Sequence, residues 1–180
     1  LKVGIDGAAT TDQLDPASWI SGYMMVVGCA WGDTLVRTDP VSGMALPALA
    51  ESWESSEKSS RWIFQLRKDV LFHNGKTLTA DDVVKTITRH RDPKFRSGVI
   101  AYLSAIDTVA AEGNAINIKL KESNVDFPLV LSLWNLQIQP GGGYDNPSAG
   151  IGTGPYRIVK FEAGVYTQLE KNPHDWDDSR

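Results

Sequence analysis

From Trp62 to Val84 the chain reads WIFQLRKDVLFHNGKTLTADDVV, which predicts a strand, a tight turn and a capped helix in quick succession. Every second residue from Trp62 to Leu66 is large and apolar, the period-two pattern of a half-buried strand. Asn74-Gly75 is a pair suited to the positive φ angles of a tight turn. Thr79 then precedes apolar residues at helical spacing, so its hydroxyl is the expected N-cap of a helix.

Hairpin patterns continue on both sides of this stretch. The expected strands are separated by polar or glycine-containing turns and lie at Lys2–Asp6, Trp53–Ser55, Arg61–Arg67, Val70–His73, Ser104–Ala111, Ile116–Lys121, Tyr156–Phe161 and Tyr166–Glu170. Two further helices are expected, one after Ser21 and one from Asp126 through Trp134. Strands and helices are interspersed without strict alternation, so the sequence predicts an α/β fold with a mixed sheet, hairpins and flanking helices.

Composition excludes several classes of protein. The 180 residues are 42% hydrophobic with a formal net charge of −4, which is typical of a packed chain and gives no electrostatic footprint for nucleic acid. The densest basic stretch, Lys85 to Arg96, contains Asp92 and is interpreted as a solvated helix face. The single cysteine, Cys29, lies in an apolar run and is expected to be a buried structural thiol. No run reaches the roughly 18 apolar residues of a membrane span.

Three patterns typical of catalytic or cofactor sites each lack a necessary part. Gly150 to Pro155 is rich in glycine, but a strand rather than a helix is expected after it, so it does not read as a phosphate loop. The histidines His73, His90 and His174 lack the spacing of metal ligands. No serine lies in a strand-to-helix elbow of the hydrolase type. We therefore expect no catalytic residue, no cofactor and no metal site.

The order of sequence blocks adds a resemblance to a known family. The blocks that carry it are PALAESWE from Pro47 to Glu54, WIFQLRKDV from Trp62 to Val70, and FHNGK with LTADDVV between Phe72 and Val84. Together they resemble the family 5 extracellular solute-binding proteins, which include the oligopeptide-, dipeptide- and nickel-binding proteins of ABC importers. Shorter matches follow the same order, at Leu14-Asp15-Pro16, Gly152 to Tyr156 and Lys171-Asn172-Pro173.

The resemblance implies the type II periplasmic-binding-protein fold, in which two lobes close on a solute. Residues 1–37 would begin the first lobe, residues 38–135 would form an inserted subdomain, and residues 136–180 would return to the first lobe. Family members are longer, so we expect a fragment that stops before the second lobe, has lost its export signal and tends to self-associate. The implied function is periplasmic or other extracytoplasmic capture of a peptide or small solute, without catalysis, for ABC permease subunits in the membrane.

The same resemblance places candidate ligand-contacting residues along the inner edge of the first lobe. They lie in the loop after the first expected strand, in the segment after Leu-Asp-Pro, in a basic loop and at the end of a helix: Ala9, Thr10, Trp19, Ser21, Tyr23, Arg96, Trp134 and Asn135. Trp19 and Trp134 are equally well explained as core aromatics, and Arg96 as an exposed loop cation. The alternative function is a protein–protein interaction or sensor module built on the same fold.

Overall fold

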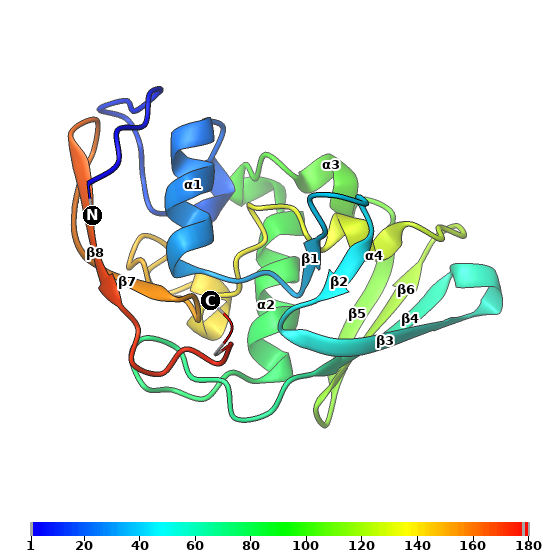
Figure 1. Ribbon diagram of the computed structural model, residues 1–180. Helices are drawn as coiled ribbons and strands as arrows, with labels where there is room; N and C mark the ends of the chain where they lie inside the picture. The colour runs from blue at the N-terminus through cyan, green and yellow to red at the C-terminus, as the bar shows by residue number, and fades with distance from the viewer. Residues whose placement is uncertain (1, 178, 180) are drawn as a thin grey trace.

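The computed structural model describes residues 2–177 and 179. Its helices, shown in Figure 1, are η1 Pro16–Ser18, α1 Gly22–Trp31, η2 Glu57–Ser59, α2 Ala80–Arg91, η3 Pro93–Phe95, α3 Ile100–Leu103, α4 Phe127–Val130 and η4 Pro140–Gly143. Its strands are β1 Val36–Thr38, β2 Ala45–Pro47, β3 Ala50–Ser56, β4 Arg61–Leu66, β5 Ile106–Glu112, β6 Ala115–Leu120, β7 Tyr156–Glu162 and β8 Tyr166–Lys171. The expected α/β class is therefore confirmed.

The strands form three antiparallel sheets, with the orders β1-β2, β3-β4-β6-β5 and β7-β8. A mixed sheet was expected from the sequence. Among the described residues every strand pairing is antiparallel, and the strands divide into three separate sheets. Strands that follow each other in the sequence and are joined by short turns pair as antiparallel hairpins. A parallel pair would need a long crossover connection between the two strands.

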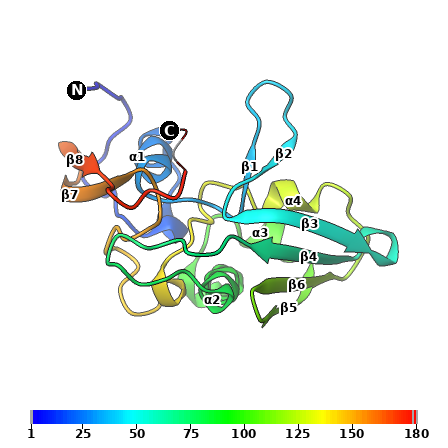
Figure 2. The same cartoon turned by 60° about the horizontal axis from the view of Figure 1, so that its bottom comes forward.

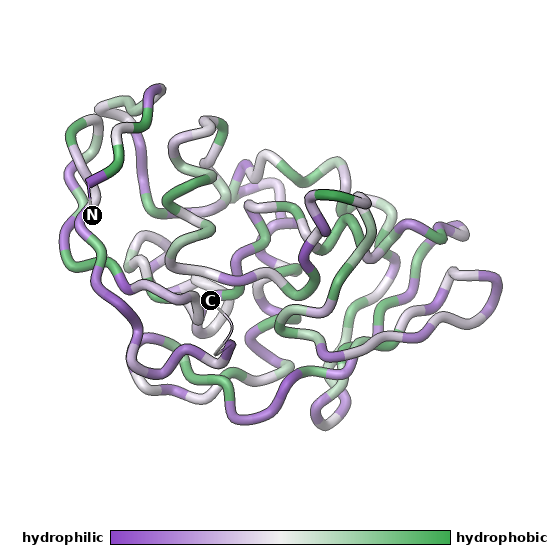
Figure 3. The backbone as a smooth tube through the Cα atoms, viewed as in Figure 1, coloured by the Kyte–Doolittle hydropathy of each residue, from purple (hydrophilic) through white to green (hydrophobic). Residues whose placement is uncertain are grey.

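The four-stranded sheet buries one face under α2, and the two lie side by side in Figures 1 and 2. Alternate residues of β4 and β6 point to that face and are at most 6% exposed: Trp62, Phe64, Leu66, Ile116, Ile118 and Leu120. Val83 and Ile87 of α2 pack against them in the same apolar cluster. The turn between β3 and β4, at Glu57–Ser59, has no buried residue, and the tube in Figure 3 runs from purple to white there. This alternation confirms the half-buried strand that was predicted from residue 62 onward.

Helix α2 begins where the sequence predicted it. The Thr79 hydroxyl accepts a hydrogen bond from the Asp82 N–H, and the Asp82 side chain accepts from the Thr79 N–H, which together form a capping box. The other carboxylate oxygen of Asp82 accepts from the Gly141 N–H at 2.7 Å, which draws η4 against the helix. Gly142 is then so close to α2 that a Cβ there would lie 2.6 Å from the Lys85 carbonyl carbon. The helix start thus also fixes the glycine-rich segment that follows residue 140.

A second apolar cluster lies between α1 and the β7–β8 hairpin. Its buried members are Leu14, Trp19, Tyr23, Met24, Val27 and Trp31, and Trp134, Ile158 and Phe161 pack against them. The Ser21 hydroxyl caps α1 by accepting from the Met24 N–H at 3.2 Å, as predicted. The larger cluster contains Leu35 and Val36 as well as the sheet. The boundaries expected at residues 37 and 135 stay a prediction.

Several local expectations are wrong. Residues 2–6 form no strand, and Val70–His73 contributes only the isolated bridge between Leu71 and Thr77. The helix after Asp126 spans four residues and ends at Val130, before Trp134, and the Asp126 side chain makes no capping bond. Cys29 is exposed, because it lies on the side of α1 opposite to the second cluster.

Candidate solute-binding site

Trp19 and Trp134 form a stacked pair in the second apolar cluster. Their ring centroids are 6.1 Å apart with planes inclined by 7°. The Trp31 and Trp19 rings are arranged at 89° to each other, with their centroids 5.9 Å apart. Trp19 is 2% exposed, and its Nε1 donates to the Gln13 carbonyl at 2.8 Å. Trp134 is only partly buried. Trp19 is thus a core aromatic, whereas Trp134 is a partly exposed residue.

Asn135 follows Trp134 and is buried beside the same pair. Its Nδ2 donates to the carbonyls of Pro16 at 2.8 Å and Trp19 at 3.0 Å. The amide therefore binds the chain immediately before α1, and both Nδ2 protons are used in doing so.

Two more candidates lie on α1 and its cap. Ser21 uses its hydroxyl for the cap, and Tyr23 is 7% exposed with its hydroxyl 2.9 Å from Thr167 Oγ1 on β8. The structure therefore brings Trp19, Tyr23, Trp134 and Asn135 into one cluster, with Ser21 between two of them along the chain.

The remaining candidates, Ala9, Thr10 and Arg96, lie in exposed loops outside this cluster. Ala9 and Thr10 are exposed, and the turn of β7–β8 approaches them so closely that a Cβ on Gly164 would lie 2.9 Å from the Thr10 nitrogen. Arg96 is exposed and ends η3 with φ 50° and ψ 38°, a left-handed conformation. It lies two residues before Gly98, whose N–H binds the Ala17 carbonyl at 3.1 Å.

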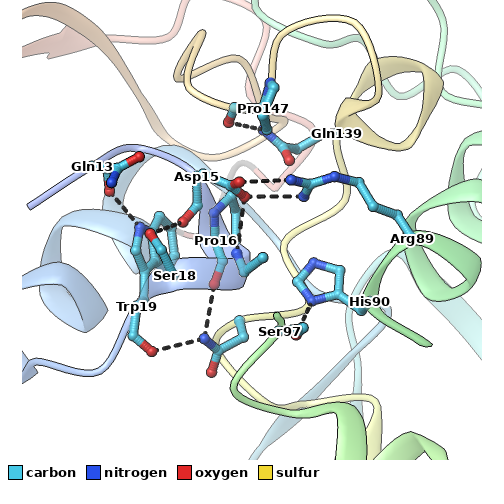
Figure 4. A network of polar contacts seen from close by, with 12 residues as sticks. Gln13, Asp15, Pro16, Ser18, Trp19, Arg89, His90, Ser97, Gln139 and Pro147 are labelled. Carbon is cyan, nitrogen blue, oxygen red and sulfur yellow. Dashed lines mark hydrogen bonds and ion pairs between the residues drawn. The ribbon is translucent and has the colours of Figure 1, made fainter. Parts of the chain in front are cut away.

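A buried ion pair that the sequence did not predict links this region to α2 (Figure 4). Arg89 donates through Nη1 to Asp15 Oδ1 at 3.0 Å and through Nη2 to Asp15 Oδ2 at 2.6 Å. Arg89 and His90 are each 1% exposed, so the interpretation of this stretch as a solvated helix face is wrong for these two residues. Lys85, Lys94 and Arg96 are exposed, as expected. The available signal was helical spacing, because His90 lies seven residues after Val83 on the same buried stripe.

His73 is one of several polar links between the larger cluster and the chain after residue 150. Its Nε2 donates to the Gly154 carbonyl at 3.0 Å, and its Nδ1 accepts from the Gly152 N–H at 3.4 Å. Burial lowers the pKa of His73 below its usual value, and the Nδ1 contact requires the neutral ring. Within the described part of the chain, no group of three or more histidine, cysteine or acidic side chains is arranged to hold a metal ion.

A shallow hollow of about 370 Å³ lies on the four-stranded sheet. It is lined by small and polar residues such as Thr108, Ala110 and Asn117, with Lys119 at its rim. None of the candidate ligand-contacting residues lines it. The helices of residues 2–177 include none with the length and apolar character needed to cross a membrane.

The sequence pattern of the middle region of bacterial extracellular solute-binding proteins, family 5, matches residues 45–180. The chain belongs to this family. The probable ABC transporter periplasmic-binding protein SapA of Escherichia coli is 25% identical over 92% of the chain, which covers 36% of that relative. The chain thus spans about a third of the length of the relatives it matches.

Solved structures of family 5 proteins have the same fold. AgaA of A. tumefaciens R10, in complex with agropinic acid, superposes with a TM-score of 0.86 at 26% identity over 95% of this chain and 36% of its own. NikZ of Campylobacter jejuni, in complex with Ni(L-His), superposes with a TM-score of 0.81 at 27% identity over the same shares. The type II periplasmic-binding fold that the resemblance implied is therefore confirmed for this part of the protein.

Proposed function

We propose that this chain is part of the extracytoplasmic solute-binding component of an ABC importer and acts by binding alone, without catalysis. The observation that carries the proposal is the superposition of 95% of the chain on AgaA, a family member solved with its small solute bound. Other relatives are a di/tripeptide-binding protein of Pseudomonas aeruginosa and a nickel-binding periplasmic protein of Escherichia coli. A peptide or another small polar solute is the proposed ligand, and the membrane subunits of the importer are the proposed partner.

The proposed contact surface is the accessible side of Trp134 with the rim around it. A half-buried indole stacked on a second, buried indole is a rigid apolar surface, and pockets for small molecules use such surfaces together with a few polar groups. Tyr23 belongs to the same apolar cluster as Trp134, and the loop at Ala9 and Thr10 is approached by the β7–β8 turn. Ser21 and Arg96 are proposed as further contacts on the family resemblance. Trp19 and Asn135 would act by holding Trp134 in place.

Enclosure by a second lobe is what would give such a site its affinity. Small-molecule pockets bury about 70–90% of their ligand, and the described chain offers one side of such an enclosure. We expect the 180-residue chain to bind a solute at least about a thousandfold more weakly than a two-lobed protein, since losing about 4 kcal/mol of contacts has that effect.

The test is a thermal-shift and calorimetric screen with di- and tripeptides, agropinic acid and Ni(L-His), on the chain and on any longer protein that its gene encodes. A ligand at about a hundred times its Kd stabilises the folded state by about 2.7 kcal/mol, which raises Tm by about 5–10 °C in a 180-residue chain and by less in a longer protein. If no probe raises Tm in the longer protein, solute capture is refuted. If both proteins bind equally well, the role of enclosure is refuted.

The proposed contact surface has its own test. Trp134→Ala should weaken the best probe about tenfold or more, as expected for an aromatic anchor. Trp53→Ala is the matched control, because Trp53 is also partly buried but packs against Phe64 of the four-stranded sheet. Equal effects of the two substitutions would refute the placement of the solute at Trp134.

The proposed surface for self-association of the chain is the outer side of α1 together with Ile20, which precedes the helix. Ile20, Met25 and Val26 expose 90%, 40% and 45% of their surface. Adjacent exposed apolar side chains favour association. Light scattering should show a concentration-dependent mass that Met25→Lys reduces, and an unchanged mass distribution in this variant would refute the assignment.

A further inference from the structure

The segment that leads into Trp19 is too short to hold its own position. Helix η1 is a single turn of three residues, and such turns are stable only when other groups bind them. The direction in which Trp19 enters the core therefore depends on the contacts made to η1 and to Asp15, which caps it through a bond from the Ala17 N–H at 3.0 Å.

Arg89 binds this cap in a way that fixes direction as well as distance. Its two terminal nitrogens donate to the two carboxylate oxygens of Asp15, and its side chain is 2% exposed. A forked pair of this kind aligns the planes of both groups, which a single contact does not do. Figure 4 shows the Arg89 guanidinium reaching from α2 to Asp15, the residue that caps η1.

Arg89 also contacts the ring of Phe95. Its guanidinium carbon lies 4.6 Å from the centroid of the Phe95 ring, and α2 is anchored in the larger cluster through Val83 and Ile87. The position of α2 is thereby linked to Asp15 and η1 through one buried side chain whose guanidinium group is planar.

Asn135 makes a second set of contacts to η1, in addition to those made through Asp15. It donates to the Pro16 and Trp19 carbonyls at the two ends of η1, and it is covalently next to Trp134, which stacks on Trp19. Both partners of the tryptophan pair are thus tied to the same short turn, one by its main chain and the other through its neighbour.

We infer that Arg89 and Asn135 are positioning residues that set the stacking of Trp19 on Trp134, and through it the ring surface that Trp134 offers to a solute. The inference about the solute rests on the proposed function, whereas the inference about the stack does not. Neither residue needs to touch the ligand for its loss to weaken binding.

The experiment measures the tryptophan band in the near-ultraviolet circular dichroism of the 180-residue chain, a signal that coupled indoles produce. Trp19→Phe also removes the contact of Trp19 with Trp31. Only the part of the band that Trp19→Phe and Trp134→Phe both remove is therefore assigned to the pair. Arg89→Lys and Asn135→Ala are then compared with the unmodified chain. Lysine keeps the charge but lacks the fork, so it cannot align the Asp15 carboxylate.

Two controls separate positioning from a general loss of stability. Arg91→Lys is the same substitution two residues along α2, where the guanidinium donates to the Ile106 carbonyl at 2.7 Å instead of to η1. Thr79→Ala removes the cap at the other end of α2 and lowers stability without changing the contacts of Arg89 or Asn135 to η1 and its cap Asp15. All spectra are taken at a temperature where denaturation curves show every variant folded.

The expected result is loss of most of the pair's band in Arg89→Lys and Asn135→Ala, and its retention in Arg91→Lys and Thr79→Ala. The same two variants should weaken the best peptide probe about tenfold, in the range that small displacements of a binding group cost. A pair band that survives in both folded variants overturns the inference. If the band is lost as expected but no probe binds even the unmodified protein, the stack assignment stands and the proposed function fails.

Discussion

His90 should make the protein less stable in mild acid. The side chain is 1% exposed, its Nδ1 lies 2.7 Å from Ser97 Oγ, and its Nε2 has no hydrogen-bond partner among the described residues. In the protonated ring both nitrogens carry hydrogen, and the Nε2–H would have no acceptor among the described residues. Burial, and to a smaller extent the charge of Arg89, lower the pKa of His90 to about 4, against an opposing effect of Asp15.

The sign and size follow from the difference between the folded and unfolded states. The usual pKa of 6.5 describes His90 in the unfolded chain, so between pH 6.5 and 4 the unfolded chain binds the proton and the folded protein does not. Stability is therefore complete above the unfolded pKa and is lost as pH falls towards the folded pKa. Linkage gives a loss of about 2 kcal/mol at pH 5 and about 3 kcal/mol at pH 4 relative to neutral pH.

The measurement is urea denaturation at pH 7.5, 6, 5 and 4 on the unmodified chain and on His90→Asn. Asparagine places an amide near the Nδ1 position and does not titrate, so it keeps a contact to Ser97 without the protonation step. The difference between the two proteins removes the contributions of all other titrating groups. A difference that stays constant within about 0.5 kcal/mol from pH 7.5 to 4 would refute the reasoning, because His90 would then titrate alike in both states.

Three further substitutions test single features. Thr79→Ala should lower the unfolding free energy by about 1 kcal/mol through loss of the α2 cap, and an unchanged urea midpoint would show that the cap is not used. Gly142→Ala should cost about 2 kcal/mol or more, because φ is +71° and the new Cβ meets the Lys85 backbone; wild-type stability would mean that η4 does not lie against α2. His73→Gln should leave the metal content of chelator-free protein unchanged, with no stoichiometric zinc or nickel by elemental analysis before or after; a metal equivalent lost in this variant would contradict the structural role of His73.

Elements whose signals are local were predicted from the sequence, and those that depend on a distant partner were not. The Thr79 cap, the Ser21 cap and the alternation in β4 each involve residues a few positions apart, and the structure has all three. Lys2–Asp6 has an alternating composition, but a strand exists only when another strand accepts its hydrogen bonds. That information is not present in a window of five residues.

The same distinction applies to the site. The cluster around Trp19 and Trp134 contains four of the candidate residues, and these came from the resemblance rather than from spacing. The Asp15–Arg89 pair joins residues 74 positions apart, and neither residue alone differs from an ordinary cap or a surface cation. A buried stripe on α2 indicates which residues point inward, but only the tertiary structure shows what neutralises an arginine there.

The Asp15–Arg89 ion pair between the two apolar clusters fixes a relative orientation, which apolar contacts alone do not. Hydrophobic burial favours contact without fixing direction, whereas a forked pair has one geometry. Replacing Asp15 and Arg89 together by leucine and methionine should leave the unfolding free energy unchanged or raise it by about 1–4 kcal/mol, as such exchanges do elsewhere. The tryptophan pair band should nevertheless be weakened, because η1 would lose its alignment. A double variant that is both as stable and as well ordered at the Trp19–Trp134 pair would show that packing alone sets the stacking of these two rings.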